Sequence, residues 1–243
     1  MGDLVAYTGV GASYAERVVA PSRLLEKLPQ GMNAETGAAA MLQGMTAHCL
    51  AHDAYPLARG DRAVVHAGAG GTGLLLIQMA KRLGAYVFAT VSTQAKAAVA
   101  RDAGADEVIV YTEEAFDEAV NRATDGEGVQ VVYDSVGQST FERGFNCLAI
   151  QGYMVLYGQA SGPVPAFDSR VLSKGSHSLV RPFLGHYTRN RKELLQRAGA
   201  VLSGIQSGHL TLRIHTTLPL SDAREAHRLL EGRLTTGKLL LIP

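Results

Sequence analysis

Tryptophan is absent from this 243-residue chain, and cysteine occurs only twice. Cys49 and Cys147 lie far apart and neither belongs to a Cys-x-x-Cys pair, which excludes a disulfide framework and a zinc knuckle. No apolar run approaches the roughly 20 residues of a membrane span, and the N-terminus has neither the basic start nor the apolar stretch of a signal peptide. We therefore expect a cytoplasmic protein with no membrane partner.

An excess of either charge is also lacking. The 23 basic and 22 acidic residues leave a formal charge of +1, and no stretch concentrates lysine and arginine into a stripe that could follow a phosphate backbone. Nucleic acid is therefore not an expected partner. The apolar share of 47% is ample for the core of a globular protein of this length.

From residue 63 onward, short β-rich runs alternate with helical stretches. This alternation is typical of βαβ crossovers and predicts a parallel sheet covered on both faces, the α/β class. We expect strands at 63–66, 86–90, 107–111, 130–133 and 153–157, and helices at 73–83, 93–103 and 113–124. Gly84 is expected to end the first of these helices.

The two ends of the chain follow other patterns. Glycines and prolines divide residues 1–37 into short alternating runs, such as 14–20, which predict antiparallel strands. Asp222 followed by Glu225 predicts a capping box at the start of a helix. The last sixty residues are expected to supply helices near 189–206 and 222–231 and strands near 212–217 and 239–242.

A glycine-rich turn directly follows the first predicted strand and opens the first predicted helix. Gly68, Gly70 and Gly73 match G-x-G-x-x-G in that context. A dinucleotide diphosphate must approach backbone N–H groups at a helix N-terminus, and a Cβ at these positions would hold it off. The turn therefore predicts a dinucleotide-binding domain, with a ligand-free tight turn as the alternative.

The stretch after the second strand indicates which nucleotide binds. A site for NAD places an Asp or Glu there for the ribose hydroxyls, but residues 90–96 contain no carboxylate and end in Lys96. A lysine could neutralise a 2′-phosphate, so the sequence favours NADPH. The missing acid also argues against an S-adenosylmethionine methyltransferase. The alternative for Lys96 is a surface helix residue without a ligand.

Taken together, several motifs resemble the zinc-independent quinone oxidoreductases, the zeta-crystallin-like family of the medium-chain dehydrogenase/reductase superfamily. Besides the glycine turn, the resemblance rests on residues 11–16, 42–47, 133–137, 157–163 and 235–239. It runs nearly end to end. Family members carry roughly eighty further N-terminal residues, so the chain is expected to enter partway through their catalytic domain.

The resemblance implies a fold, a domain division and a cofactor site. The fold would be a Rossmann-type doubly wound sheet with a partial GroES-like β-barrel. The partial catalytic domain would span 1–44, the NADPH-binding domain 45–182, and the return to the catalytic domain 183–243. The implied NADPH ligands are Thr46 on the nicotinamide side, Gly68, Gly70, Gly71, Thr72 and Gly73 at the diphosphate, Ser92, Lys96 and Tyr111 around the 2′-phosphate, Ser135, Tyr157 and Gln159 near the riboses, and Arg233. Gln159 stands where the family has Asn.

A metal is not expected. Zinc-dependent relatives carry a ligand four residues before the position of Thr46, where this chain has Leu42. His48 and His52 have the i, i+4 spacing of a helical metal pair, but no third ligand is in view and a plain helix face is preferred. Catalytic residues are not identified, since the substrate-facing ones are expected in the segment that the chain lacks.

The implied activity is hydride transfer from NADPH to a small quinone or α,β-unsaturated carbonyl compound. A short-chain dehydrogenase is excluded because no tyrosine has a lysine four residues later. The alternative is an NADPH-binding protein without turnover, structural or sensory. A homodimer is expected because residues 178–180 form a short apolar strand that would lie at the exposed edge of the sheet.

Overall fold

The computed structural model describes residues 2–243, which divide into two compact units. Unit 1 comprises residues 2–49, Gly70–Leu75 and Leu184–Pro243. Unit 2 comprises Leu50–Ala69 and Leu76–Phe183. Among the described residues, no helix combines the length and the apolar content needed to cross a lipid bilayer.

Unit 2 is built on a six-stranded parallel sheet with the strand order β5-β4-β3-β6-β7-β8. The chain starts in the middle at β3, moves outward through β4 and β5, and then returns to continue from β6 in the opposite direction. Ligands of such doubly wound sheets bind at the carboxyl ends of the strands, near this switch. The Rossmann-type fold class is confirmed. The strands are β3 (Arg62–Val65), β4 (Tyr86–Val91), β5 (Glu107–Val110), β6 (Val129–Asp134), β7 (Leu148–Leu156) and β8 (Ser178–Val180).

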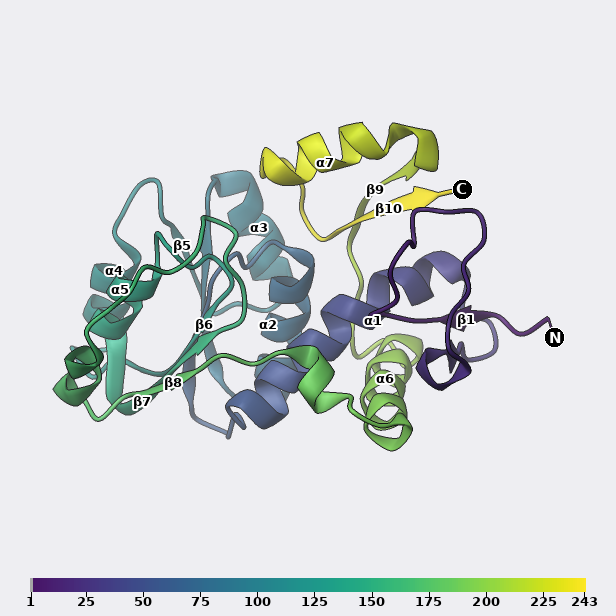
Figure 1. The fold of residues 1–243 in the computed structure, drawn as a ribbon. Helices are drawn as coiled ribbons and strands as arrows, with labels where there is room; N and C mark the ends of the chain where they lie inside the picture. The colour runs from purple at the N-terminus through teal and green to yellow at the C-terminus, as the bar shows by residue number, and fades with distance from the viewer. Residues whose placement is uncertain (1) are drawn as a thin grey trace. The chain divides into compact units, whose positions relative to one another are not determined.

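Helices cover both faces of this sheet. Figure 1 shows α4 (Phe116–Ala123) and α5 (Phe141–Gly144) on one side and α2 (Gly71–Leu83) and α3 (Gln94–Asp102) on the other. Gly84 has a φ of 88° and ends α2 as predicted. The prediction for α4 began three residues too early, because the N–H groups of Glu113 and Glu114 both donate to the carbonyl of Val110 and form a turn before the helix.

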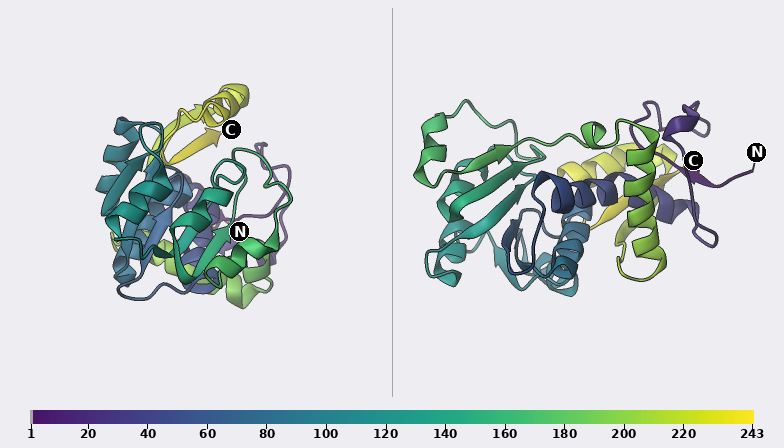
Figure 2. Two further views of the ribbon diagram at one scale, coloured as in Figure 1. Left: turned by 90° about the vertical axis from the view of Figure 1, so that its left-hand side faces the viewer. Right: turned by 90° about the horizontal axis from the view of Figure 1, so that it is seen from below.

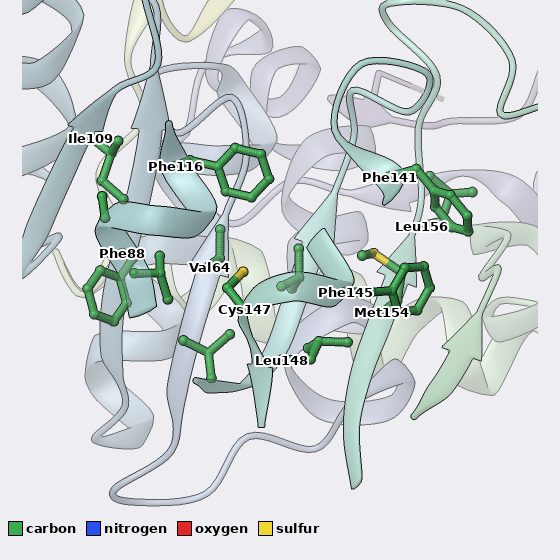
Figure 3. Close-up of a cluster of buried hydrophobic side chains, with 14 residues drawn as sticks. Val64, Phe88, Ile109, Phe116, Phe141, Phe145, Cys147, Leu148, Met154 and Leu156 are labelled. Carbon is green, nitrogen blue, oxygen red and sulfur yellow. The ribbon is translucent and has the colours of Figure 1, made fainter. Parts of the chain in front are cut away.

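The core of unit 2 includes a cluster of buried side chains on the side of α4 and α5. Figure 3 shows Phe116 and Phe141 from the helices among strand residues such as Val64, Phe88 and Met154. These five side chains are at most 3% exposed. Burial of a large apolar side chain stabilises the fold by about 1.5–3 kcal/mol, which explains why the strands are almost continuously apolar.

Unit 1 contains three long helices and two small sheets. The helices are α1 (Ala34–Cys49), α6 (Arg191–Gln206) and α7 (Ala223–Glu231). Strand β1 (Val5–Ala6) pairs antiparallel with β2 (Glu26–Lys27), and β9 (Ile214–Pro219) pairs parallel with β10 (Lys238–Ile242). Figure 2 shows α7 running beside the β9–β10 pair, which it contacts. The described residues form no closed barrel.

Two local predictions in unit 1 were wrong. Residues 14–20 do not form a strand, because their backbone pairs with no other segment among the described residues. Asp222 makes no capping bond to α7, since the chain enters that helix through a 3-10 turn that leaves Asp222 at φ −95° and ψ 20° rather than extended. Glu225, the other member of the predicted box, instead binds Arg228 at 2.7 Å.

Short helices complete the fold. Five are 3-10 helices, at Ser22–Leu24, Phe145–Cys147, Ser169–Lys174, Leu184–Tyr187 and Leu220–Asp222, and a π-helix at Leu50–Ala54 continues directly from α1.

Candidate cofactor site

The glycine turn lies at the carboxyl end of β3, where the backbone is tied to both neighbouring strands. The N–H of His66 donates to the carbonyl of Tyr133 at 3.1 Å, and the N–H of Gly68 donates to the carbonyl of Thr90 at 3.0 Å. A Cβ on Gly68 would lie 2.8 Å from the Cβ of Ala89, closer than real Cβ contacts allow. Gly68 is therefore required for packing of the turn against β4.

The first turn of α2 supplies backbone donors. The N–H of Leu74 donates to the carbonyl of Gly70 at 2.9 Å, and this is the first hydrogen bond of the helix. The N–H groups of Gly71, Thr72 and Gly73 come before it in the chain and lie at the open end of the helix. In unit 1, Gly70 also forms an isolated parallel bridge with Gly237. N–H groups at the positive end of a 13-residue helix are suited to a diphosphate.

The ends of β4 and β5 bring Ser92, Lys96 and Tyr111 to one end of the sheet. The two strands pair Val91 with Val110, and the N–H of Tyr111 continues the ladder to the carbonyl of Val91 at 3.0 Å. Ser92 and Lys96 are half-buried, and Tyr111 is exposed. A second contact fixes the same corner, since the hydroxyl of Thr112 donates to the carbonyl of Ser92 at 3.1 Å.

The start of α3 is fixed by Thr93. Its hydroxyl oxygen accepts a hydrogen bond from the N–H of Lys96 at 3.2 Å, so Thr93 is the N-cap residue rather than the first helical one. A carboxylate lies nearby that the sequence reasoning missed: Glu113 accepts from the Gln94 amide at 2.8 Å. It follows β5 rather than β4, so residues 90–96 contain no signal for it.

Asp134 joins the loops after β6 and β7. Its buried carboxylate accepts from the N–H groups of Val136 at 2.7 Å and Gly137 at 3.0 Å, and its carbonyl accepts from the N–H of Tyr157 at 2.8 Å. The carbonyl of Ser135 accepts from Ala160 N–H at 3.1 Å. The two loops that carry Ser135, Tyr157 and Gln159 are thus held together at the carboxyl end of the sheet.

Within this loop pair, burial raises the pKa of Tyr157 to about 12, although the neighbouring side chain of Ser135 acts in the opposite direction. Tyr157 therefore stays protonated at neutral pH and keeps a hydroxyl proton to donate. Gln159 is exposed. Gly137 has a φ of 84°, and a Cβ built on it would lie 3.1 Å from the Cα of Gln159.

Thr46 and Arg233 belong to unit 1. The hydroxyl of Thr46 donates to the carbonyl of Leu42 one turn earlier in α1, at 2.7 Å. Its proton is therefore used within the helix, and its lone pairs are left to accept a bond from a ligand. Arg233 lies in the turn after α7 with a φ of 55°, and its N–H donates to the carbonyl of Leu230 at 3.0 Å.

Comparison with known proteins identifies the family. Residues 71–200 match the family model described as "Zinc-binding dehydrogenase". The chain is 40% identical over 245 residues to a quinone oxidoreductase of Pseudomonas aeruginosa, covering 100% of this chain and 75% of that protein. The chain belongs to the quinone oxidoreductase family. The chain spans three quarters of the length of the Pseudomonas aeruginosa protein.

Two further relatives are named for a cofactor or a substrate. The structure of Escherichia coli quinone oxidoreductase complexed with NADPH superposes with a TM-score of 0.88 and 40% identity, covering 91% of this chain and 69% of that one. A 2-haloacrylate reductase of a Burkholderia species is 36% identical over 236 residues, covering 95% of this chain and 71% of that protein.

In this quinone oxidoreductase-family chain, Leu42, which the resemblance places at the position of the zinc ligand of zinc-dependent relatives, is 49% exposed. The described residues contain no group of three or more His, Cys, Asp or Glu side chains that could hold a metal. His48 has a different contact, since its Nδ1 lies 2.9 Å from an Nη atom of Arg197. A guanidinium can only donate, so Nδ1 accepts and the ring carries its proton on Nε2.

His66 is a further polar residue that the sequence reasoning missed. It is only 1% exposed, its Nδ1 lies 2.8 Å from the hydroxyl of Thr90, and its ring meets Phe116 edge to face. Within residues 2–243, its Nε2 has no hydrogen-bond partner. Burial lowers the pKa of His66, although the carboxylate of Asp134 acts in the opposite direction. The ring of His66 is therefore uncharged at neutral pH.

Proposed function

We propose that this protein is a zinc-independent reductase that uses NADPH to reduce a quinone or an α,β-unsaturated carbonyl compound. The observation that carries the proposal is the pairing of two cofactor elements at the carboxyl ends of the strands. One is the glycine turn with the backbone N–H groups of the first turn of α2. The other is the corner of Ser92, Lys96 and Tyr111, which offers a cation and two hydroxyls to a 2′-phosphate.

The residues that the resemblance assigns to NADPH have the chemistry that each part of the cofactor requires. The amides of Gly71 to Gly73 would hold the diphosphate, and the hydroxyls of Ser135 and Tyr157 and the amide of Gln159 would bind near the riboses. Thr46, as an acceptor, suits the amide group of the nicotinamide. Arg233 would add a second cation for the 2′-phosphate. The relative that was solved with NADPH supports this choice of nucleotide.

When bound, NADPH supplies the hydride. Reduction of a quinone to a hydroquinone also takes up a proton, which water can supply because the reduced quinone is a ready proton acceptor. The protein is then required to orient the two reactants and to exclude side reactions, rather than to provide a general acid. The names of the relatives support both acceptor classes, a quinone and a conjugated carboxylate. Zinc independence is supported by Leu42 at the ligand position.

The test is calorimetric titration of the purified chain with NADPH and with NADH, followed by NADPH consumption with 1,4-benzoquinone. We expect selective NADPH binding and turnover. Lys96→Ala and Arg233→Ala should each weaken NADPH about tenfold and NADH much less, since each removes a cation from the 2′-phosphate. Arg101→Ala, an exposed cation later in α3, is the matched control and should change neither affinity.

Three other results of these measurements would count against parts of the proposal. Binding without turnover of quinones or 2-haloacrylates would favour a protein that only binds the nucleotide. Equal losses for NADPH and NADH would remove Lys96 or Arg233 from the 2′-phosphate site. Absence of any NADPH binding would overturn the proposal.

A further inference from the structure

The side chain of Gln43 covers Gly71, the residue of the glycine turn at which α2 begins. Gln43 lies on α1, and both it and Gly71 belong to unit 1. A Cβ built on Gly71 would overlap the Oε1, Cδ and Nε2 atoms of Gln43, so the carboxamide occupies the space that any other residue at position 71 would need. Gly71 has no positive φ, and its lack of a side chain is therefore explained by this contact rather than by backbone conformation.

The carboxamide is placed there without an evident structural reason. Gln43 is half-buried, and among the residues that the structure describes its side chain makes no hydrogen bond. A carboxamide has two N–H donors and an accepting oxygen, which folded proteins normally satisfy when the group is held in place. The two N–H donors of this carboxamide, held beside Gly71, are therefore available to a ligand.

The position of Gln43 on α1 indicates which part of a ligand it would meet. Gln43 and Thr46 are three residues apart and so share one face of the helix. Thr46 is the residue proposed above for the nicotinamide side. Because Gln43 lies on Gly71 at the start of α2 and on the same face as Thr46, its amide is suited to the diphosphate oxygens on the nicotinamide side.

We infer that Gln43 is a cofactor-binding residue of this protein, whose side-chain N–H donates to the diphosphate of NADPH next to the nicotinamide ribose. This inference rests on the proposed function and deepens it by adding a ligand that the glycine motif does not contain. The bond from a neutral amide to an anionic oxygen is charge-assisted and stronger than a bond between neutral groups. Gly71 allows this bond because its lack of a side chain leaves room for the carboxamide.

The first test compares three proteins, the wild type, Gln43→Ala and Gln43→Glu, by titration with NADPH and with 2′,5′-ADP, which lacks the nicotinamide half. Gln43→Ala should weaken NADPH about tenfold. Gln43→Glu keeps the size of the side chain but replaces the donors with a negative charge, so it should weaken NADPH further, and added salt should reduce the difference. Binding of 2′,5′-ADP should change by less than about twofold in both variants.

Gln196→Ala and Gln196→Glu are the matched controls, because Gln196 is exposed on α6 of the same unit. They should leave both ligands unaffected. A purely structural role for Gln43 predicts a different pattern: a lowered Tm, with equal losses for NADPH and 2′,5′-ADP. That pattern, or NADPH affinities within twofold of the wild type for both Gln43 variants, would overturn the inference while leaving the proposed function intact.

A double-mutant cycle tests the contact itself. Gly71→Ala should fold, since the group that it meets is the end of a flexible side chain, but it should displace the carboxamide. Gln43→Ala should therefore cost about tenfold in NADPH affinity in the wild type and almost nothing in the Gly71→Ala background. Additive losses would mean that Gln43 does not act from this position. A wild-type chain that binds no NADPH would refute both the inference and the proposed function.

Discussion

At the scale of single residues, a buried polar pair lies among the apolar side chains of the sheet of unit 2. His66 and Thr90 lie on neighbouring strand ends and are each 1% exposed, with their side chains 2.8 Å apart. The backbone carbonyl of Thr90 also accepts the N–H of Gly68. The pair therefore joins the buried histidine to the residue that holds the glycine turn. Such buried groups are costly when they lose their partner.

Thr90→Val keeps the shape of the side chain and removes the hydroxyl. It leaves both ring nitrogens of His66 without a hydrogen-bond partner, so we expect the free energy of unfolding to fall by about 1–3 kcal/mol. The measurement is urea unfolding followed by circular dichroism. Thr112→Val is the control: Thr112 also makes a side-chain bond but is exposed, and its loss should cost no more than about 0.5 kcal/mol. Equal effects of the two substitutions would contradict a buried role for the pair.

At the scale of elements, two helices of unit 1 begin in different ways although their sequences look alike. Asn190 precedes α6, and its side-chain oxygen accepts from the N–H of Glu193 at 3.0 Å. Asp222 precedes α7 with the same spacing to Glu225 but makes no such bond. The backbone decides the difference, since Asn190 is extended at φ −131° and ψ 167° and Asp222 is not.

The two helix starts allow a matched comparison. Asn190→Ala removes a real cap and should lower the free energy of unfolding by about 1 kcal/mol. Asp222→Ala removes a side chain that caps nothing and should cost less than about 0.5 kcal/mol. Thermal unfolding by calorimetry would measure both. If Asp222→Ala proved the more damaging of the two, Asp222 would have to stabilise α7 by a contact other than capping.

At the scale of the whole molecule, the parallel sheet of unit 2 has β5 and β8 at its two ends. The expectation that residues 178–180 form an edge strand is confirmed, and all three residues of β8 are half-buried. An edge strand presents unpaired N–H and carbonyl groups, which a second copy can satisfy by isologous pairing. The predicted homodimer would use this strand. The predicted domain division at residues 44 and 182 also stays a prediction.

Sedimentation of a homodimer joined through β8 would give a mass twice that of the chain, which is 25.7 kDa. Ser178→Lys should shift it toward the monomer, because lysine on an edge strand blocks pairing between sheets. Val108→Lys, on β5 at the opposite edge, should not. Sedimentation velocity at several concentrations distinguishes these outcomes. A wild type that sediments as a monomer at all concentrations, or a dimer that only Val108→Lys dissociates, would exclude β8 as the interface.

Much of this protein follows from local patterns in its sequence. The alternation of β-rich and helical runs predicted the parallel sheet, and the glycines predicted the turn after β3, because apolar periodicity and glycine conformation act over a few residues. Some local predictions were wrong: the turn at Glu113 and Glu114 makes α4 begin later than predicted, and residues 14–20 form no strand because their backbone pairs with no other described segment.

Contacts between distant segments were decided only by the tertiary structure. Gln43 reaches Gly71, Glu113 reaches Gln94, and His66 meets Thr90, and none of these pairs has a signal in its own stretch of sequence. Each depends on how helices and strands pack and in which register the strands pair. The sequence by itself determined the elements and the type of cofactor turn. Packing decided which further side chains surround that turn, because long-range contacts are set by the geometry of whole elements.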